Sequence, residues 1–139
     1  MIQIISGVKG KGKTKFLIQK ANEAVKAANG SVVYLDKNNK HMYELSNKVR
    51  LIKVMDYSIS NCDEFIGFIC GIISQDHDLQ QMYFDSFLKI AKLEDWSLSV
   101  VVEKLEKLSE QFGVDFVLSV SCDEKELDDS LKSKIIVSL

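Results

Sequence analysis

Short hydrophobic runs along this chain alternate with longer stretches in which hydrophobic residues recur every three or four positions. Runs of that length are typical of buried strands, and the longer spacing is typical of amphipathic helices. Strands alternating with helices favour a three-layer α/β/α sandwich around a mainly parallel sheet. The predicted strands are 2–6, 31–36, 50–54, 80–85, 115–121 and 135–139.

The clearest helix is predicted over 97–112, where Ser97 is a suitable N-cap and Gly113 a suitable stop. An earlier helix is expected to begin near residue 13, with Leu17 and Ala21 on its apolar face, and to stop at Asn29-Gly30.

A third helix is predicted over 59–74. We expect Gly67 and Gly71 to let a neighbouring backbone approach it closely. The segment 87–96 shows no period and is expected to form a loop over the functional site.

Length and charge limit the classes of protein. With 139 residues and 46% hydrophobic content, the chain suits one domain spanning 1–139. A net charge of −2 argues against broad binding to nucleic acid or an anionic membrane, because those partners require a dense positive field.

The location of the protein is also constrained. Residues 1–5 are expected to form a core strand and not a signal peptide, so the protein is expected to be cytoplasmic. The apolar run Phe65 to Ile73 is about half the length of a membrane span, and it predicts a buried helix or a contact face for a second copy or a protein partner. Three scattered cysteines and two histidines do not suggest a zinc site.

A phosphate-binding loop follows the first predicted strand. Residues 7–14 read GVKGKGKT and match the pattern G-x-x-x-x-G-K-[ST] completely. In this pattern backbone N–H groups surround the phosphates, the lysine reaches the β- and γ-phosphates, and the hydroxyl ligates Mg²⁺. We therefore expect a nucleoside triphosphate and Mg²⁺ as ligands. The predicted nucleotide-binding residues are Gly7, Val8, Lys9, Gly10, Lys11, Gly12, Lys13, Thr14 and Lys15.

A carboxylate is needed to complete the metal shell, usually at the end of an apolar strand. Asp85 follows Met82-Tyr83-Phe84 and is the predicted residue, together with Thr14. The alternative is that Asp85 only caps the next segment. Asp56 is the second choice for the metal role.

These motifs together resemble the RecA-like branch of the P-loop ATPases. The loop 7–14 matches the first phosphate motif of that branch, 83–86 resembles its second motif, and 116–121 is similar to the strand between them. The resemblance implies a RecA-like strand order, with 115–121 between the first strand and the strand ending at Asp85. The nearest overall resemblance is to small, stand-alone bacterial ATP-binding proteins.

The resemblance also implies catalytic roles for Lys13 and for an acidic residue that positions the attacking water. Asp36 stands at the matching place, where the family more often has glutamate. Because aspartate is one methylene shorter, slow hydrolysis is expected. The alternative is that Asp36 only begins a turn.

Three functions remain open from the sequence. The first is an ATP-binding protein with slow or partner-stimulated ATPase activity. The second is a small-molecule or nucleoside kinase, which usually needs several arginines, whereas this chain has only Arg50. The third is a regulatory subunit that binds nucleotide without turnover. Guanine specificity is not supported, because Asn47-Lys48 lacks the closing aspartate of N-K-x-D.

Overall fold

A six-stranded sheet forms the centre of the computed structural model, which describes residues 1–93 and 96–139. All the strand pairs are parallel, and the strand order is β3-β2-β4-β5-β1-β6. β5 therefore lies between β1 and β4, as the sequence predicts. The strands are β1 (Ile2–Ser6), β2 (Ser31–Asp36), β3 (Arg50–Lys53), β4 (Leu79–Phe84), β5 (Asp115–Val120) and β6 (Ile135–Ser138).

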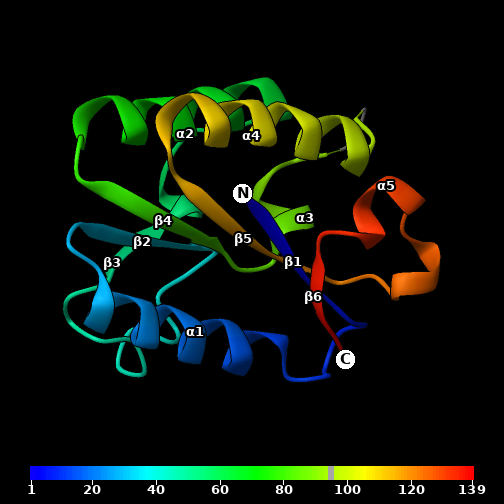
Figure 1. Cartoon of the computed structure of the whole chain (residues 1–139), viewed down its shortest axis with the longest axis horizontal. Helices are drawn as coiled ribbons and strands as arrows, with labels where there is room; N and C mark the ends of the chain where they lie inside the picture. Colours follow the sequence, from blue (N-terminus) through cyan, green and yellow to red (C-terminus); the bar gives the residue numbers. More distant parts are fainter. Residues whose placement is uncertain (94–95) are drawn as a thin grey trace.

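Helices cover both faces of the sheet (Figure 1). One face is covered by α1, and the other by α2 and α4, which gives the predicted three layers. Of the two short helices, α3 lies between β4 and α4, and α5 lies between β5 and β6. The helices are α1 (Lys13–Ala27), α2 (Cys62–Gln75), α3 (Phe87–Ile90), α4 (Leu98–Phe112) and α5 (Asp129–Lys132), with 3₁₀ turns η1 (Val54–Asp56) and η2 (Glu124–Glu126).

Side-chain caps set where α4 and α2 begin. The Ser97 hydroxyl accepts a hydrogen bond from the Val100 N–H at 3.3 Å, and α4 ends at Gly113, whose φ is 67°. Both ends agree with the prediction. The Asn61 side chain accepts from the Glu64 N–H at 2.9 Å, so α2 begins at Cys62, later than expected.

The close backbone approach predicted at two glycines of α2 occurs at a different glycine. Gly67 and Gly71 lie on the exposed side of α2, and a Cβ at either would meet nothing within 4 Å, so the expected close approach there is wrong. The close approach is at Gly30, where a Cβ would lie 1.9 Å from the Asp78 carbonyl oxygen. Gly30 therefore lets the start of β2 lie close to the residue before β4. The helix α1 ends at Ala27, slightly before the predicted stop at Asn29-Gly30.

The remaining differences from the prediction are local. Val54 belongs to the turn η1, and Asp85 and Ser121 lie just beyond the ends of their strands. The segment expected to be a loop begins with the helix α3, while Glu94 and Asp95 lie outside the described residues.

Candidate nucleotide site

The loop between β1 and α1 is built on left-handed glycines. Gly10 and Gly12 have φ of 88° and 87°, a conformation that costs a residue with a side chain energy. Lys13 begins α1 and is only 7% exposed. Its ammonium donates to the Val8 carbonyl oxygen at 3.0 Å. Burial lowers the pKa of Lys13, and the nearby Asp85 carboxylate opposes that change.

At the carboxyl ends of β2, β4 and β5, close to this loop, the side chains on the α1 face change from apolar or aromatic to polar. Side chains alternate between the faces of a sheet. On the α1 face, Tyr34 is followed by Asp36 along β2, and Val117 is followed by Ser119 along β5. Tyr83 is likewise followed by Asp85. The polar groups therefore gather at the carboxyl ends of parallel strands, where ligands bind in open α/β sheets.

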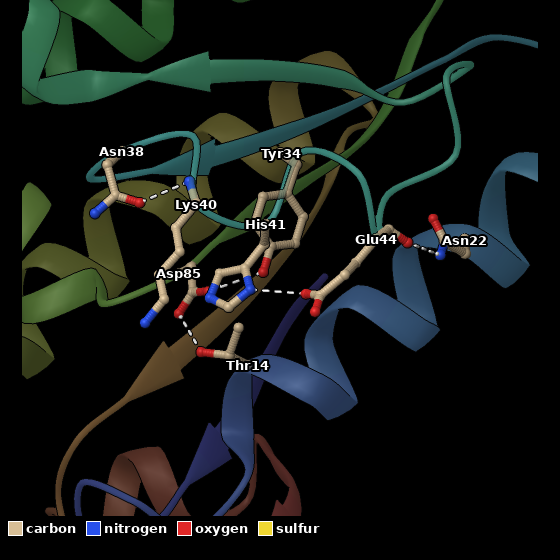
Figure 2. A network of polar contacts seen from close by, with 8 residues as sticks. All are labelled: Thr14, Asn22, Tyr34, Asn38, Lys40, His41, Glu44 and Asp85. Atoms are coloured by element: carbon tan, nitrogen blue, oxygen red, sulfur yellow. Dashed lines mark hydrogen bonds and ion pairs between the residues drawn. The ribbon is translucent and has the colours of Figure 1, made fainter.

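Asp85 is a buried carboxylate with a partner at each oxygen. Its Oδ1 accepts a hydrogen bond from the Thr14 hydroxyl at 3.2 Å, and its Oδ2 accepts one from the Tyr34 hydroxyl at 2.9 Å (Figure 2). The Asp85 side chain thus contacts Thr14 in the first turn of α1. Ser86, the next residue, is left-handed with φ 53°, which turns the chain sharply into α3.

Asp36 is buried beside these groups and is 3% exposed. Its Oδ1 accepts a hydrogen bond from the Lys37 N–H at 2.7 Å. Burial raises the pKa of Asp36, and the negative charge of Asp85 raises it further. A carboxyl group with a raised pKa is a stronger proton acceptor once it is ionised.

One cleft of about 590 Å³ brings most of the predicted site residues together. The predicted residues that line it are Lys9, Gly10, Gly12, Lys13, Thr14, Asp36 and Asp85. Gly7, Val8, Lys11 and Lys15 are not among its lining residues, and Lys15 lines a neighbouring groove along α1. Asp56 lies in η1, pairs with Lys53 at 3.0 Å, and does not line the cleft.

Several lining residues were not predicted from the sequence. Lys37, Lys40 and His41 come from the loop after β2, and Lys89 comes from α3. In Figure 2 Lys40 and His41 extend over Thr14 and Asp85. For the three loop residues the only signal was the position of that loop directly after Asp36, and for Lys89 it was the expectation that 87–96 lies over the site. Lys37, Lys40 and Lys89 add positive charge to the cleft, which suits a polyphosphate.

The loop after β2 is fixed to α1 by Asn22. The Asn22 side chain donates to the Glu44 carbonyl oxygen at 2.9 Å and accepts from the Ser46 N–H at 2.7 Å. The Glu44 carboxylate in turn contacts His41 Nδ1 at 2.7 Å. These contacts hold the loop beside the cleft.

Arg50 lies at the amino end of its strand, whereas the cleft lies at the carboxyl ends of the strands. It begins β3 and donates to the Asp76 carboxylate at 2.9 Å. Since the site is at the carboxyl ends of the strands, Arg50 cannot neutralise charge in the cleft of its own chain.

The residues at the cleft suit Mg²⁺. Thr14 and Asp85 offer hard oxygen donors beside each other, and Mg²⁺ is usually held by one or two carboxylates together with substrate phosphates. Within residues 1–93 and 96–139, no group of three or more histidine, cysteine, aspartate and glutamate side chains could hold a metal alone. In the same ranges, no helix is long and apolar enough to cross a membrane.

Comparisons with known proteins support the fold. No family model and no curated protein matches the chain. Its structure is similar to the crystal structure of flagellar accessory protein FlaH from Methanocaldococcus jannaschii, with a TM-score of 0.59 and 15% sequence identity. The match covers 95% of this chain and 65% of FlaH, so the chain spans slightly less than two thirds of the FlaH length. The fold is thus RecA-like, as the sequence predicts.

Proposed function

We propose that this protein binds ATP with Mg²⁺ in the cleft and hydrolyses it slowly. The observation that carries this proposal is the convergence of Lys13, Thr14, Asp36 and Asp85 on one cleft behind a glycine-rich loop. Backbone N–H groups of the loop and the Lys13 ammonium would bind the β- and γ-phosphates. Thr14 and Asp85 would hold Mg²⁺, which when bound neutralises charge on the phosphate oxygens.

Asp36 is the residue proposed to act on water. In hydrolysis a water oxygen bonds to the γ-phosphorus, the bond from that phosphorus to the bridging oxygen breaks, and ADP leaves. Asp36 would orient the water and accept its proton. The buried, negatively charged surroundings raise the pKa of Asp36, which favours proton acceptance but reduces the ionised fraction.

Slow turnover follows from the charges available in the cleft. Arginine supplied in cis or in trans speeds such reactions by about 10³–10⁵. Arg50 lies at the amino end of β3, away from the cleft, so lysines are the cationic side chains that line the cleft among the described residues, apart from the titratable His41. We expect turnover by the isolated protein well below ~10 s⁻¹, with activation by a second copy or a protein partner.

Binding measurements on a pair of lysine variants test the proposal. Lys13→Ala removes the buried ammonium and should weaken ATP binding in Mg²⁺ by at least ~100-fold, equivalent to about 2.7 kcal/mol. Lys11→Ala is the matched control, because Lys11 is an exposed residue of the same loop that does not line the cleft. Calorimetric titration with ATP gives both affinities, and circular dichroism checks the fold. Equal loss in the two variants would contradict the proposed site.

A further inference from the structure

The Tyr34 hydroxyl is a buried polar group that donates a hydrogen bond to Asp85. Tyr34 is fully buried, and its hydroxyl donates to Asp85 Oδ2 at 2.9 Å. It is not among the residues that line the cleft, and it contacts the cleft residue Asp85 (Figure 2). Burying a hydroxyl costs free energy unless it is hydrogen-bonded, so the contact with Asp85 compensates for the burial of this hydroxyl.

The sheet fixes the direction of the Tyr34 ring. Tyr34 on β2 is paired in register with Tyr83 on β4, and the two rings stack with centroids 6.4 Å apart and planes at 13°. Both rings belong to the buried cluster on the α1 face. The hydroxyls diverge, because Tyr83 donates to Gln81 on its own strand while Tyr34 donates to Asp85.

The two oxygens of Asp85 are consequently divided between two neighbours. Tyr34 engages Oδ2, and the other oxygen, Oδ1, is turned to Thr14 at 3.2 Å. Rotation of the carboxylate would break both hydrogen bonds. The hydrogen bond from Tyr34 to Oδ2 thus holds Oδ1 beside the Thr14 hydroxyl.

We propose that Tyr34 is a positioning residue that orients the Asp85 carboxylate for Mg²⁺ bound beside Thr14. This inference rests on the proposed function. Partners of this kind, which contact a metal ligand and not the metal, typically contribute 10- to 100-fold to metal affinity. Tyr34 therefore contributes to the metal-dependent part of ATP binding and not to the part that the phosphate loop provides alone.

A pair of tyrosine variants separates positioning from packing. Tyr34→Phe removes one oxygen and keeps the ring, and Tyr83→Phe makes the same change in the stacked partner, whose hydroxyl points away from the site. ATP affinity is measured for each protein in Mg²⁺ and in EDTA, and the ratio gives the Mg²⁺ enhancement. Tyr34→Phe should lower that enhancement about 10-fold with the affinity in EDTA unchanged, and Tyr83→Phe should leave both values unchanged.

A second pair of measurements ties the effect to Asp85. In an Asp85→Asn background, Tyr34→Phe should cause no further loss of Mg²⁺ enhancement, because the carboxylate that it orients is gone. Circular dichroism and thermal melting of every variant check that the comparison concerns folded protein.

Two results would overturn the inference, and they differ from failure of the proposed function. If the parent protein binds ATP with a clear Mg²⁺ enhancement that Tyr34→Phe retains, Tyr34 is only a core residue. If Tyr34→Phe and Tyr83→Phe lower the enhancement equally, the effect comes from packing. If the parent itself shows no ATP binding, the proposed function and this inference both fail.

Discussion

The two faces of the sheet differ in what they bury. The face under α2 and α4 is covered by a large cluster of apolar side chains, including Phe65, Phe84, Phe87 and Phe116, whose rings pack edge to face at 5.7–6.1 Å. The face under α1 has a smaller cluster that includes two stacked tyrosines, and it continues directly into the polar site.

This difference predicts that the α2–α4 face mainly determines the stability of the protein and that the α1 face mainly determines ligand binding. Residues on the α2–α4 face contact other apolar groups and contribute mainly through burial. On the α1 face, burial of Lys13, Asp36 and Asp85 opposes folding unless each group is paired. Substitutions on the first face should therefore change stability with little effect on ligand binding, and substitutions at the site should change binding and can even increase stability.

The largest effect on stability is expected at Phe116. Phe116→Ala empties a fully buried position on the α2–α4 face and should lower the free energy of unfolding by about 3–5 kcal/mol. Urea denaturation measures the loss, and ATP affinity of the folded fraction should stay near that of the parent. A loss below about 1 kcal/mol would show that the apolar face does not dominate stability.

An intermediate effect of opposite sign is expected at Asp36. Asp36→Asn keeps an oxygen that can accept from the Lys37 N–H but removes a charge that burial disfavours. Stability should increase, within the ~0.5–2 kcal/mol common for stabilising substitutions, while ATP turnover falls.

The effect of Asp36→Asn on stability should depend on pH. Its pKa is higher in the folded than in the unfolded state, so ionised Asp36 destabilises the parent at neutral pH. The stability advantage of Asp36→Asn should be greatest above the raised pKa and disappear as the pH falls through it toward the unfolded value. Urea denaturation across that range measures it, and a constant difference would contradict this explanation.

The smallest effect is expected at Ser6. Its hydroxyl is fully buried and has no hydrogen-bond partner within residues 1–93 and 96–139, and strand alternation places Ser6 on the α2–α4 face. Ser6→Ala should raise the free energy of unfolding by up to about 1 kcal/mol, as measured by urea denaturation. A clear loss of stability would show that the hydroxyl has a partner in solution.

The sequence predicted those parts of the fold and site that depend on local pattern. The loop 7–14 is a contiguous motif, and the hydrophobic pattern located β2, which ends at Asp36, and β4, which ends one residue before Asp85. The strand order followed from the RecA-like resemblance. The proposed roles of these residues remain predictions.

The parts that the sequence could not predict depend on contacts between distant segments. The Tyr34 contact with Asp85 requires the register of β2 on β4, which neither strand encodes alone. Lys40 and His41 reach the cleft because Asn22 fixes their loop on α1. Gly67 and Gly71 were misinterpreted because spacing does not show which side of a helix is exposed.

The position of β1 in the sheet has a consequence for folding during synthesis. Of the six strands of the sheet, β1 is synthesised first, but its two neighbours are β5 and β6. Its pairing therefore begins only with residues such as Phe116, which pairs with Ile2. The strands β2, β3 and β4 can pair much earlier. Closing so long a loop is entropically slow, and such contacts set folding rates. The phosphate loop, anchored at the end of β1, should thus be among the last parts of a nascent chain to become ordered.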